Sequence, residues 1–338
     1  MTSPPISGRP RMRACVVLMA GLALMVTACS GDDESSGSDD DDATQRNGGS
    51  ATAVSPLTGL PTKEDAPDKP VMVVKVDNTS SARPQVGIDD ADMVVEELVE
   101  GGMTRLAGFY YSKHPKLVGP VRSMRDSDVG IVSPVDGLLV ASGGAPGTKE
   151  RIDEAGIDVL TEGSAGFARA GSRTAPYNLM IDLAAAADEL ESADAPDPYL
   201  PFDDGKLKRG KKVDSFGVTF SSSSTTRWDP TKGGWVRANG PVSPSDDFVA
   251  KNVLVLSVEV GDAGYLDPGG NPVPETKFTG DGKAMLFSNG RMVRGTWSKE
   301  DFDSSIKLET KSGKSLSVPA GHTFIELMPR NAGSVSLK

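Results

Sequence analysis

The stretch VMVVKVDN, residues 71–78, contains the clearest strand signal in the sequence. Its apolar and β-branched residues are typical of a buried strand. The pair Asp77-Asn78 at its end has the chemistry of a turn. This stretch therefore predicts a strand inside a core, and its neighbours in the sequence indicate what it packs with.

Residues 91–99 fit two structures. Their apolar positions match one face of a helix, but Val94, Val95 and Val99 also suit a strand. The turn Glu100-Gly101-Gly102 and the apolar run at 103–111 favour the second interpretation. We therefore expect a strand hairpin, in which Arg105 shares a face with Ala107 and Phe109.

Strand and helix patterns alternate in the rest of the first half. Residues 135–141 and 157–160 are predicted strands, whereas 148–155 and 180–190 are predicted helices. Pro146 fits the first turn of a helix. This order predicts an α/β layered domain over residues 55–193.

The second half has a different character. Residues 194–212 are proline-rich and then basic, which predicts a linker with a solvated basic loop. All three tryptophans and the hairpin signal Ser288-Asn289-Gly290-Arg291 follow it. Short strands are predicted at 213–220, 225–228, 234–238, 252–260, 284–287, 292–297, 305–309, 315–318 and 322–328. The predicted fold class is therefore α+β, with the N-terminal α/β layered domain followed by a β-rich C-terminal domain over residues 213–338.

The N-terminus has the layout of a secretory signal. Residues 1–13 contain arginines and no acid, and residues 14–28 form an apolar run that is short for a membrane span. The small residues before Cys29 resemble a bacterial lipobox, which implies a signal peptide over 1–28 and acyl chains such as palmitate on Cys29. An uncleaved anchor helix is the alternative. Residues 29–54 are predicted to form an acidic, disordered tether, so we expect a lipid anchor at the extracytoplasmic face of the cell membrane.

Composition excludes several classes of function. The net charge of −11 disfavours general binding of nucleic acid. Cys15 leaves with the signal and Cys29 takes the lipid, which excludes disulfides, thiolate zinc sites and cysteine nucleophiles. Only His114 and His322 are present, so a histidine-rich metal site is excluded as well. We expect no cofactor and no metal; oxygen ligands around Asp77 and Asn78 are the remaining option for a metal.

Several arginines lie near the ends of predicted elements in the first half, and two interpretations of them stay open. An arginine facing into a sheet needs an acidic partner, and Glu96, Glu97 and Glu100 are available across the hairpin. The alternative is that the guanidinium groups bind a carboxylate or phosphate of a ligand. The arginines concerned are Arg83, Arg105, Arg122 and Arg125.

A glycine-rich loop at 142–148 follows a predicted strand and precedes a predicted helix. Backbone N–H groups in such a position can face an anion. The loop matches neither of the common phosphate-binding glycine motifs. A plain tight turn is therefore the other interpretation.

Long motifs in both halves resemble the YerB-like lipoprotein family, whose domains have no assigned function. The matching segments are 77–78, 82–85, 91–92, 99–105, 119–123, 142–144, 252–253, 295–299 and 321–327. At Met103 and Phe324 the family pattern has other apolar residues. The resemblance implies a two-domain surface lipoprotein over about residues 55–330 and supplies no activity.

The resemblance also selects candidate ligand-binding residues, because several polar side chains lie in or beside these motifs. If they converge, they would form a polar pocket for an anionic or sugar-like envelope ligand. The candidates are Arg83, Gln85, Glu100, Thr104, Arg105, Arg122, Arg125, Ser142, Gly143 and Gly144.

Three functions are compatible with the sequence. The first is a non-catalytic binding or scaffolding lipoprotein, partnered by the membrane through Cys29 and by an anionic ligand or an envelope protein. The second is an envelope enzyme acting on a phosphate-linked polymer, with Arg105 and Arg122 stabilising negative charge and Glu100 as a base. The third is a purely structural protein–protein interaction module.

Overall fold

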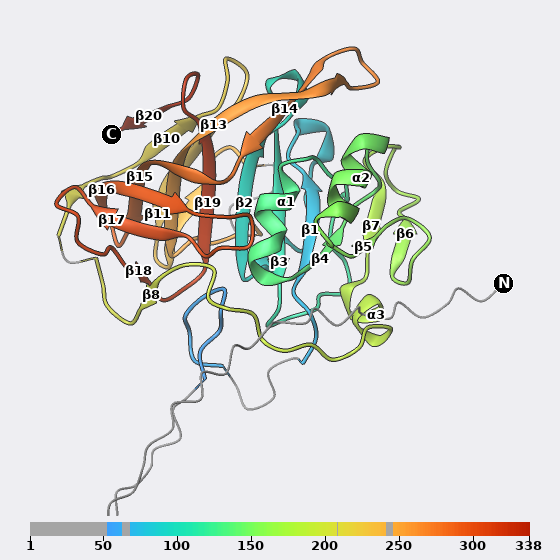
Figure 1. The fold of residues 1–338 in the computed structure, drawn as a ribbon, viewed down its shortest axis with the longest axis horizontal. Coiled ribbons are helices and arrows are strands. Elements are labelled where there is room, and N and C mark those ends of the chain that lie inside the picture. The colour runs from blue at the N-terminus through green and yellow to red at the C-terminus, as the bar shows by residue number, and fades with distance from the viewer. Residues whose placement is uncertain (1–52, 63–67, 208, 241–245) are drawn as a thin grey trace, which may run out of the picture. The chain divides into compact units, whose positions relative to one another are not determined.

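Figure 1 shows the computed structural model, which describes residues 53–62, 68–207, 209–240 and 246–338. The predicted signal peptide, Cys29 and nearly all of the predicted tether lie outside the described residues. None of the helices in these ranges has the length and hydropathy that a membrane span requires.

The predicted hairpin is confirmed and lies beside the first strand. β2 (Met93–Leu98) and β3 (Thr104–Tyr110) are antiparallel, and β3 also pairs with β1 (Met72–Asp77). Gly101 and Gly102 both have a φ of 68°, a left-handed conformation that glycine adopts without strain. The turn at 100–102 thus permits the tight connection that the sequence indicated.

A single mixed sheet joins the two halves of the chain (Figure 1). Its strand order is β17-β16-β15-β13-β19-β2-β3-β1-β4-β5, and β14 and β9 pair at its side, which gives twelve strands within the described residues. The joint is the parallel pair of β19 and β2, in which Phe324 lies opposite Val94. The further strands are β4 (Leu138–Val140), β5 (Val159–Leu160), β9 (Lys211–Lys212), β13 (Asn252–Leu266), β14 (Pro272–Lys277), β15 (Gly280–Ser288), β16 (Arg291–Lys299), β17 (Lys307–Thr310) and β19 (Thr323–Pro329).

Smaller elements cover the two faces of this sheet. The helices are α1 (Asp128–Val132), α2 (Pro146–Glu154) and α3 (Leu183–Asp188), with single 3₁₀ turns at Ser80–Ala82, Ile88–Asp90, Glu100–Gly102 and Ser133–Val135. A four-stranded sheet consists of β10 (Phe216–Thr219), β11 (Thr225–Thr231), β12 (Gly234–Arg237) and β20 (Ser334–Leu337). Two short pairs complete the structure: β6 (Phe167–Arg169) with β7 (Leu179–Ile181), and β8 (Phe202–Asp203) with β18 (Val318–Pro319).

Two hydrophobic clusters lie on opposite faces of the large sheet. Val73, Ala107 and Phe109 belong to one cluster, which also includes α1 residues. Leu106 and Val74 belong to the other, which includes Trp228 of the four-stranded sheet. Because adjacent residues of a strand point to opposite faces, each strand contributes to both clusters. All three tryptophans are buried in these clusters.

Several element boundaries differ from the sequence prediction. Residues 179–181 are a strand, and α3 begins only at Leu183 because the Asp182 side chain caps it by accepting a hydrogen bond from the Ala185 amide (3.0 Å). The strand predicted at 135–141 is confined to β4, because a 3₁₀ turn occupies 133–135. The strands β6, β8, β9, β14 and β20 were not predicted.

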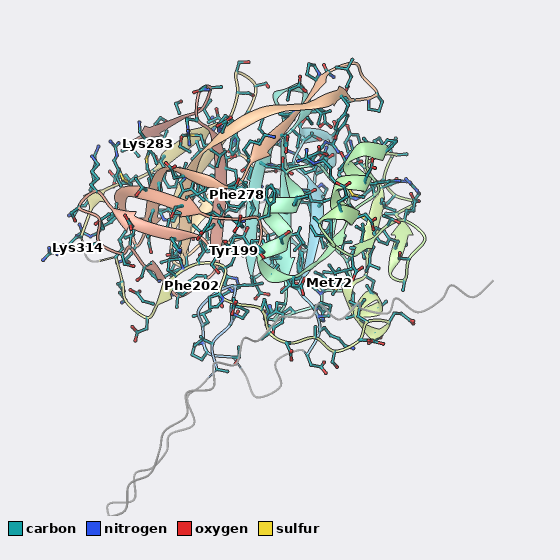
Figure 2. All side chains as sticks on the ribbon, viewed as in Figure 1. Met72, Tyr199, Phe202, Phe278, Lys283 and Lys314 are labelled. Carbon is teal, nitrogen blue, oxygen red and sulfur yellow. The ribbon has the colours of Figure 1, made fainter. Side chains whose placement is uncertain are left out.

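The segment 194–212 runs between the two halves and also contributes to the core. Tyr199 is fully buried, packs edge-on against Phe109 with 5.4 Å between ring centres, and donates a hydrogen bond to the Ile131 carbonyl (3.1 Å). Figure 2 shows Tyr199 and Phe278 in the middle of the molecule, whereas Lys283 and Lys314 lie toward its edge. The large sheet and this segment thus form one framework for the polar side chains of both halves.

Candidate functional site

A polar pocket lies where β1 ends, β3 begins and the four-stranded sheet approaches them. The cavity measures about 140 Å³. Hydroxyl, amide and guanidinium groups dominate its walls. The polar pocket is lined by Asn78, Ser80, Arg83, Thr104, Ser223, Ser224, Thr225, Thr226, Arg237, Asn239 and Gly240.

The floor of the polar pocket rests on the buried carboxylate of Glu96. Thr226 Oγ1 lies 3.0 and 2.9 Å from the two carboxylate oxygens, and Asn78 Nδ2 donates to one of them (3.0 Å). The Thr104 hydroxyl hydrogen-bonds to the same carboxylate and also accepts from Asn78 Nδ2 (2.8 Å). Three floor residues are thus fixed by one acid that the solvent does not reach.

A second acid lies directly beside Glu96. Glu326 is its register partner across the parallel strands β2 and β19, and both side chains are fully buried. Burial and the adjacent Glu96 raise the pKa of Glu326 well above its usual range, and burial also raises the pKa of Glu96. Trp228 Nε1 donates to Glu326 (2.6 Å). We call these two adjacent buried acids the carboxyl pair.

Arg237 ties the wall of the polar pocket together. It is 2% exposed, and its Nε donates to Asp247 at 2.9 Å in a buried ion pair. Its Nη1 donates to Asn78 Oδ1 and its Nη2 to Gln85 Oε1, each at 3.0 Å. The positive charge of Arg237 is thus matched by Asp247, and its remaining donors position the two amides.

Arg83 is the other guanidinium of the polar pocket and has a different setting. Arg83 directly follows the 3₁₀ turn at 80–82, and its side chain is exposed. Among the described residues its side chain makes no ion pair. It is therefore a lining cation whose donors stay available to a ligand.

The remaining predicted arginines lie on the opposite face of the large sheet. Arg105 shares a face with Ala107, whereas Thr104 shares a face with Leu106, and those two apolar residues belong to different clusters. We call Arg105, Arg122 and Arg125, with Asp77 and Glu100, the arginine cluster.

Each guanidinium group of the arginine cluster has an internal acid within ion-pairing distance. Arg125 Nε donates to Glu100 (2.9 Å), Arg105 Nη2 lies 3.6 Å from the same carboxylate, and Arg122 Nε lies 2.8 Å from Asp77. Burial, followed by the nearby charge of Arg125, lowers the pKa of Arg105 to about 10. The arrangement is the buried Arg–Glu network that was one of the two interpretations from sequence, with Glu100 as the main partner.

The loop Ser142-Gly143-Gly144 belongs with the arginine cluster. The Ser142 amide donates to the Arg122 carbonyl (2.9 Å), and Ser142 Oγ lies 3.4 Å from Ser123 Oγ. The Gly143 carbonyl accepts from the Met124 amide (2.9 Å). Helix α2 begins at Pro146, as predicted. The loop lines no part of the polar pocket.

A buried triad lies beside the arginine cluster on the same face. Lys75 Nζ donates to Glu97 (2.5 Å) and to Asp128 (2.6 Å), and all three side chains are fully buried. Burial raises the pKa of Asp128 to about 6, although the charge of Lys75 opposes this shift. Glu96 and Glu97, which the sequence offered as partners for an inward arginine, are therefore both internal and point to opposite faces of β2.

The structure brings together only part of the predicted residue set. Arg83 and Thr104 line the polar pocket and Gln85 supports it through Arg237, whereas Glu100, Arg105, Arg122, Arg125 and residues 142–144 lie across the sheet. Sequence reasoning missed Arg237, Glu326 and the segment 223–226. A charged residue inside an apolar strand run, as at Glu326, was the available signal.

Comparisons with known proteins agree with this architecture. Residues 57–196 match the N-terminal domain, and residues 216–325 the C-terminal domain, of the family described as protein of unknown function (DUF3048). A curated relative from Bacillus subtilis (strain 168), named "Putative lipoprotein YerB", is 27% identical over 299 residues, covering 83% of this chain and 88% of its own length. The crystal structure of the YerB protein from Bacillus subtilis matches with a TM-score of 0.69 and 25% identity, covering 84% of this chain and 99% of that chain.

Proposed function

The chain belongs to the DUF3048 family, and we propose that it is a lipoprotein held at the extracytoplasmic face of the cell membrane through Cys29. We further propose that its polar pocket binds a small anionic or sugar-like envelope ligand without transforming it. The observation that carries this proposal is the convergence of hydrogen-bonding side chains from both family domains on one cavity. Thr104 comes from the N-terminal domain, whereas Thr226 and Arg237 come from the C-terminal domain.

The walls of the polar pocket are fixed before any ligand arrives. Arg237 holds Asn78 and Gln85, and Glu96 holds Thr104 and Thr226. Side chains that are already positioned lose little conformational entropy on binding. This rigidity supports recognition of a defined polar ligand.

The size of the polar pocket indicates how much of a ligand it can enclose. Its volume of about 140 Å³ is below the range of roughly 300–1,000 Å³ that encloses a drug-sized molecule. The cavity therefore fits a single polar unit, such as one sugar residue or one acidic head group at the end of an envelope polymer.

The acids near the polar pocket favour binding over catalysis. Glu96 and Glu326 are completely buried behind the floor residues, and Asp247 is committed to Arg237. A general acid or base must reach the proton that it transfers, directly or through one water. On the other face, Glu100 is already paired with Arg125. The acids of the arginine cluster are likewise paired internally, Glu100 with Arg125 and Asp77 with Arg122.

A binding measurement on the full chain in detergent tests the proposed function. Acidic monosaccharides and inorganic phosphate are titrated while amide resonances of residues 223–226 and 237–240 are followed. Arg83→Ala is expected to weaken binding of charged ligands, whereas Arg294→Ala, an exposed arginine on β16, serves as the matched control. If these resonances do not shift at any ligand concentration, the polar pocket is not the binding site.

The lipid anchor is tested separately by fractionation of cells. Cys29→Ser removes the thiol that the acyl chain requires, so the protein is expected to leave the membrane fraction. Retention of the Cys29→Ser protein in membranes would favour the uncleaved anchor helix instead.

A further inference from the structure

The buried carboxyl pair determines which way the hydroxyl groups of the polar pocket point. Thr226 and Thr104 each have one O–H donor, and both are directed at Glu96. Asn78 Nδ2 donates its hydrogen bonds to Glu96 and Thr104. The side-chain donors of these three floor residues therefore point away from the cavity.

What the floor residues present to the cavity follows from this commitment. A hydroxyl whose proton is bound keeps oxygen lone pairs that accept hydrogen bonds. The floor of the polar pocket is thus an accepting surface, made by Thr104 and Thr226. A ligand group that meets it must carry O–H or N–H donors.

The local charge points in the same direction. The carboxyl pair lies directly behind the floor, where Thr226 hydrogen-bonds to Glu96 and Trp228 Nε1 donates to Glu326. The guanidinium of Arg237 faces the pair, but Asp247 neutralises it. A phosphate or carboxylate at the floor would bring its negatively charged oxygens against these lone pairs, which is unfavourable at short range.

The entrance has the opposite character. Arg83 is exposed on the rim, and its donors are available there. A guanidinium binds a carboxylate or phosphate through two parallel hydrogen bonds. An acidic substituent therefore fits at the rim, at a distance from the floor.

We propose that the polar pocket is selective for a sugar residue whose hydroxyl groups donate hydrogen bonds to Thr104 and Thr226, with any acidic substituent directed outward to Arg83, and that it rejects a free phosphate at the floor. This inference rests on the proposed function and narrows it from an anionic or sugar-like ligand to a hydroxyl-donating sugar.

Three probes separate the alternatives: glucose, glucuronate and inorganic phosphate. They are titrated into the full chain in detergent, with the amide resonances of residues 223–226 as the readout. The expected order of affinity is glucuronate above glucose, with no saturable shift from phosphate. Arg83→Ala should reduce glucuronate affinity to that of glucose and leave glucose unchanged.

Variants of Thr226 test the floor directly. Thr226→Val removes the accepting oxygen and should weaken glucose and glucuronate alike by roughly tenfold, the effect of one hydrogen bond. Thr226→Ser keeps the hydroxyl and should retain binding, which guards against misfolding as the cause. Thr296→Val, on the exposed side of β16, is the matched control.

Glu96→Gln reverses the polarity of the floor. The amide that it introduces can donate to Thr104 and Thr226, which frees their O–H groups toward the cavity. Phosphate binding should appear and glucose binding should weaken. Unchanged selectivity in this variant would contradict the inference.

The outcomes distinguish failure of the inference from failure of the proposed function. Saturable phosphate binding to the wild type with no effect of Thr226→Val would overturn the inference and leave an anion-binding pocket. If none of the three probes moves the pocket resonances at tens of millimolar, both the inference and the proposed function are overturned.

Discussion

The polar pocket and the arginine cluster lie on opposite faces of the large sheet, and both contain arginines, but the acids beside those arginines are placed differently. In the arginine cluster, Glu100 and Asp77 are positioned within reach of every guanidinium. In the polar pocket, Asp247 satisfies Arg237 and no described acid pairs with Arg83. The position of the acids, more than the number of arginines, determines which guanidinium groups have an internal partner.

Removal of the cation from the buried triad should have the largest effect on stability. Lys75→Ala leaves Glu97 and Asp128 without their partner in the core. We expect a loss of about 3–5 kcal/mol in the free energy of unfolding, measured by urea denaturation. Lys113→Ala, which breaks an exposed pair with Asp90, should cost less than about 1 kcal/mol. Equal losses would show that burial does not distinguish the two pairs.

Arg105→Ala tests whether the arginine cluster is structural. Glu100 keeps Arg125 as a partner, so the loss should be smaller than at Lys75, about 2–3 kcal/mol. The folded fraction should bind glucuronate with wild-type affinity, because Arg105 lies across the sheet from the polar pocket. If the Arg105→Ala protein is stable but no longer binds glucuronate, the arginine cluster takes part in binding and the distinction between the two faces is wrong.

The pH dependence of stability should report on the triad. The pKa of Asp128 is raised to about 6 from a usual value of 3.8, so between these values the folded chain holds a proton that the unfolded chain releases. Stability therefore falls as the pH rises through this window, by about 3 kcal/mol. Asp128→Asn should flatten that part of the pH profile in urea titrations. A slope that persists in Asp128→Asn would assign it to other acids.

The smallest stability change is expected at the rim of the polar pocket. Arg83 is exposed and makes no ion pair with another described residue, so Arg83→Ala should leave the thermal midpoint unchanged. Glucuronate affinity is the quantity that should fall. A lowered midpoint in differential scanning calorimetry would mean that Arg83 has a structural role like that of the arginine cluster.

Local patterns predicted the elements better than they predicted their arrangement. The β2–β3 hairpin follows from Gly101 and Gly102, and α2 follows from Pro146 after a glycine-rich loop. The parallel pairing of β2 with β19 joins residues more than two hundred positions apart, and no periodicity encodes such a choice. The strand order, and with it the single sheet, therefore required the three-dimensional structure.

The candidate site was predicted in part for the same reason. Arg83, Gln85 and Thr104 were identified because they lie in long motifs of the first half. Alternation along β3 sends Thr104 and Arg105 to opposite faces, so neighbours in the motif are separated by the sheet. Arg237 and Glu326 reach the polar pocket only through tertiary packing.

The central position of β19 has a consequence for how the chain acquires its structure. Residues 323–329 pair with β13 on one side and β2 on the other. Because the chain is synthesised from its N-terminus, β13 and β2 each have an unpaired edge until this segment is made. Such edges invite pairing between chains. A chain truncated at residue 320 is thus expected to aggregate, and folding of the complete chain should wait for late, long-range closure of the sheet.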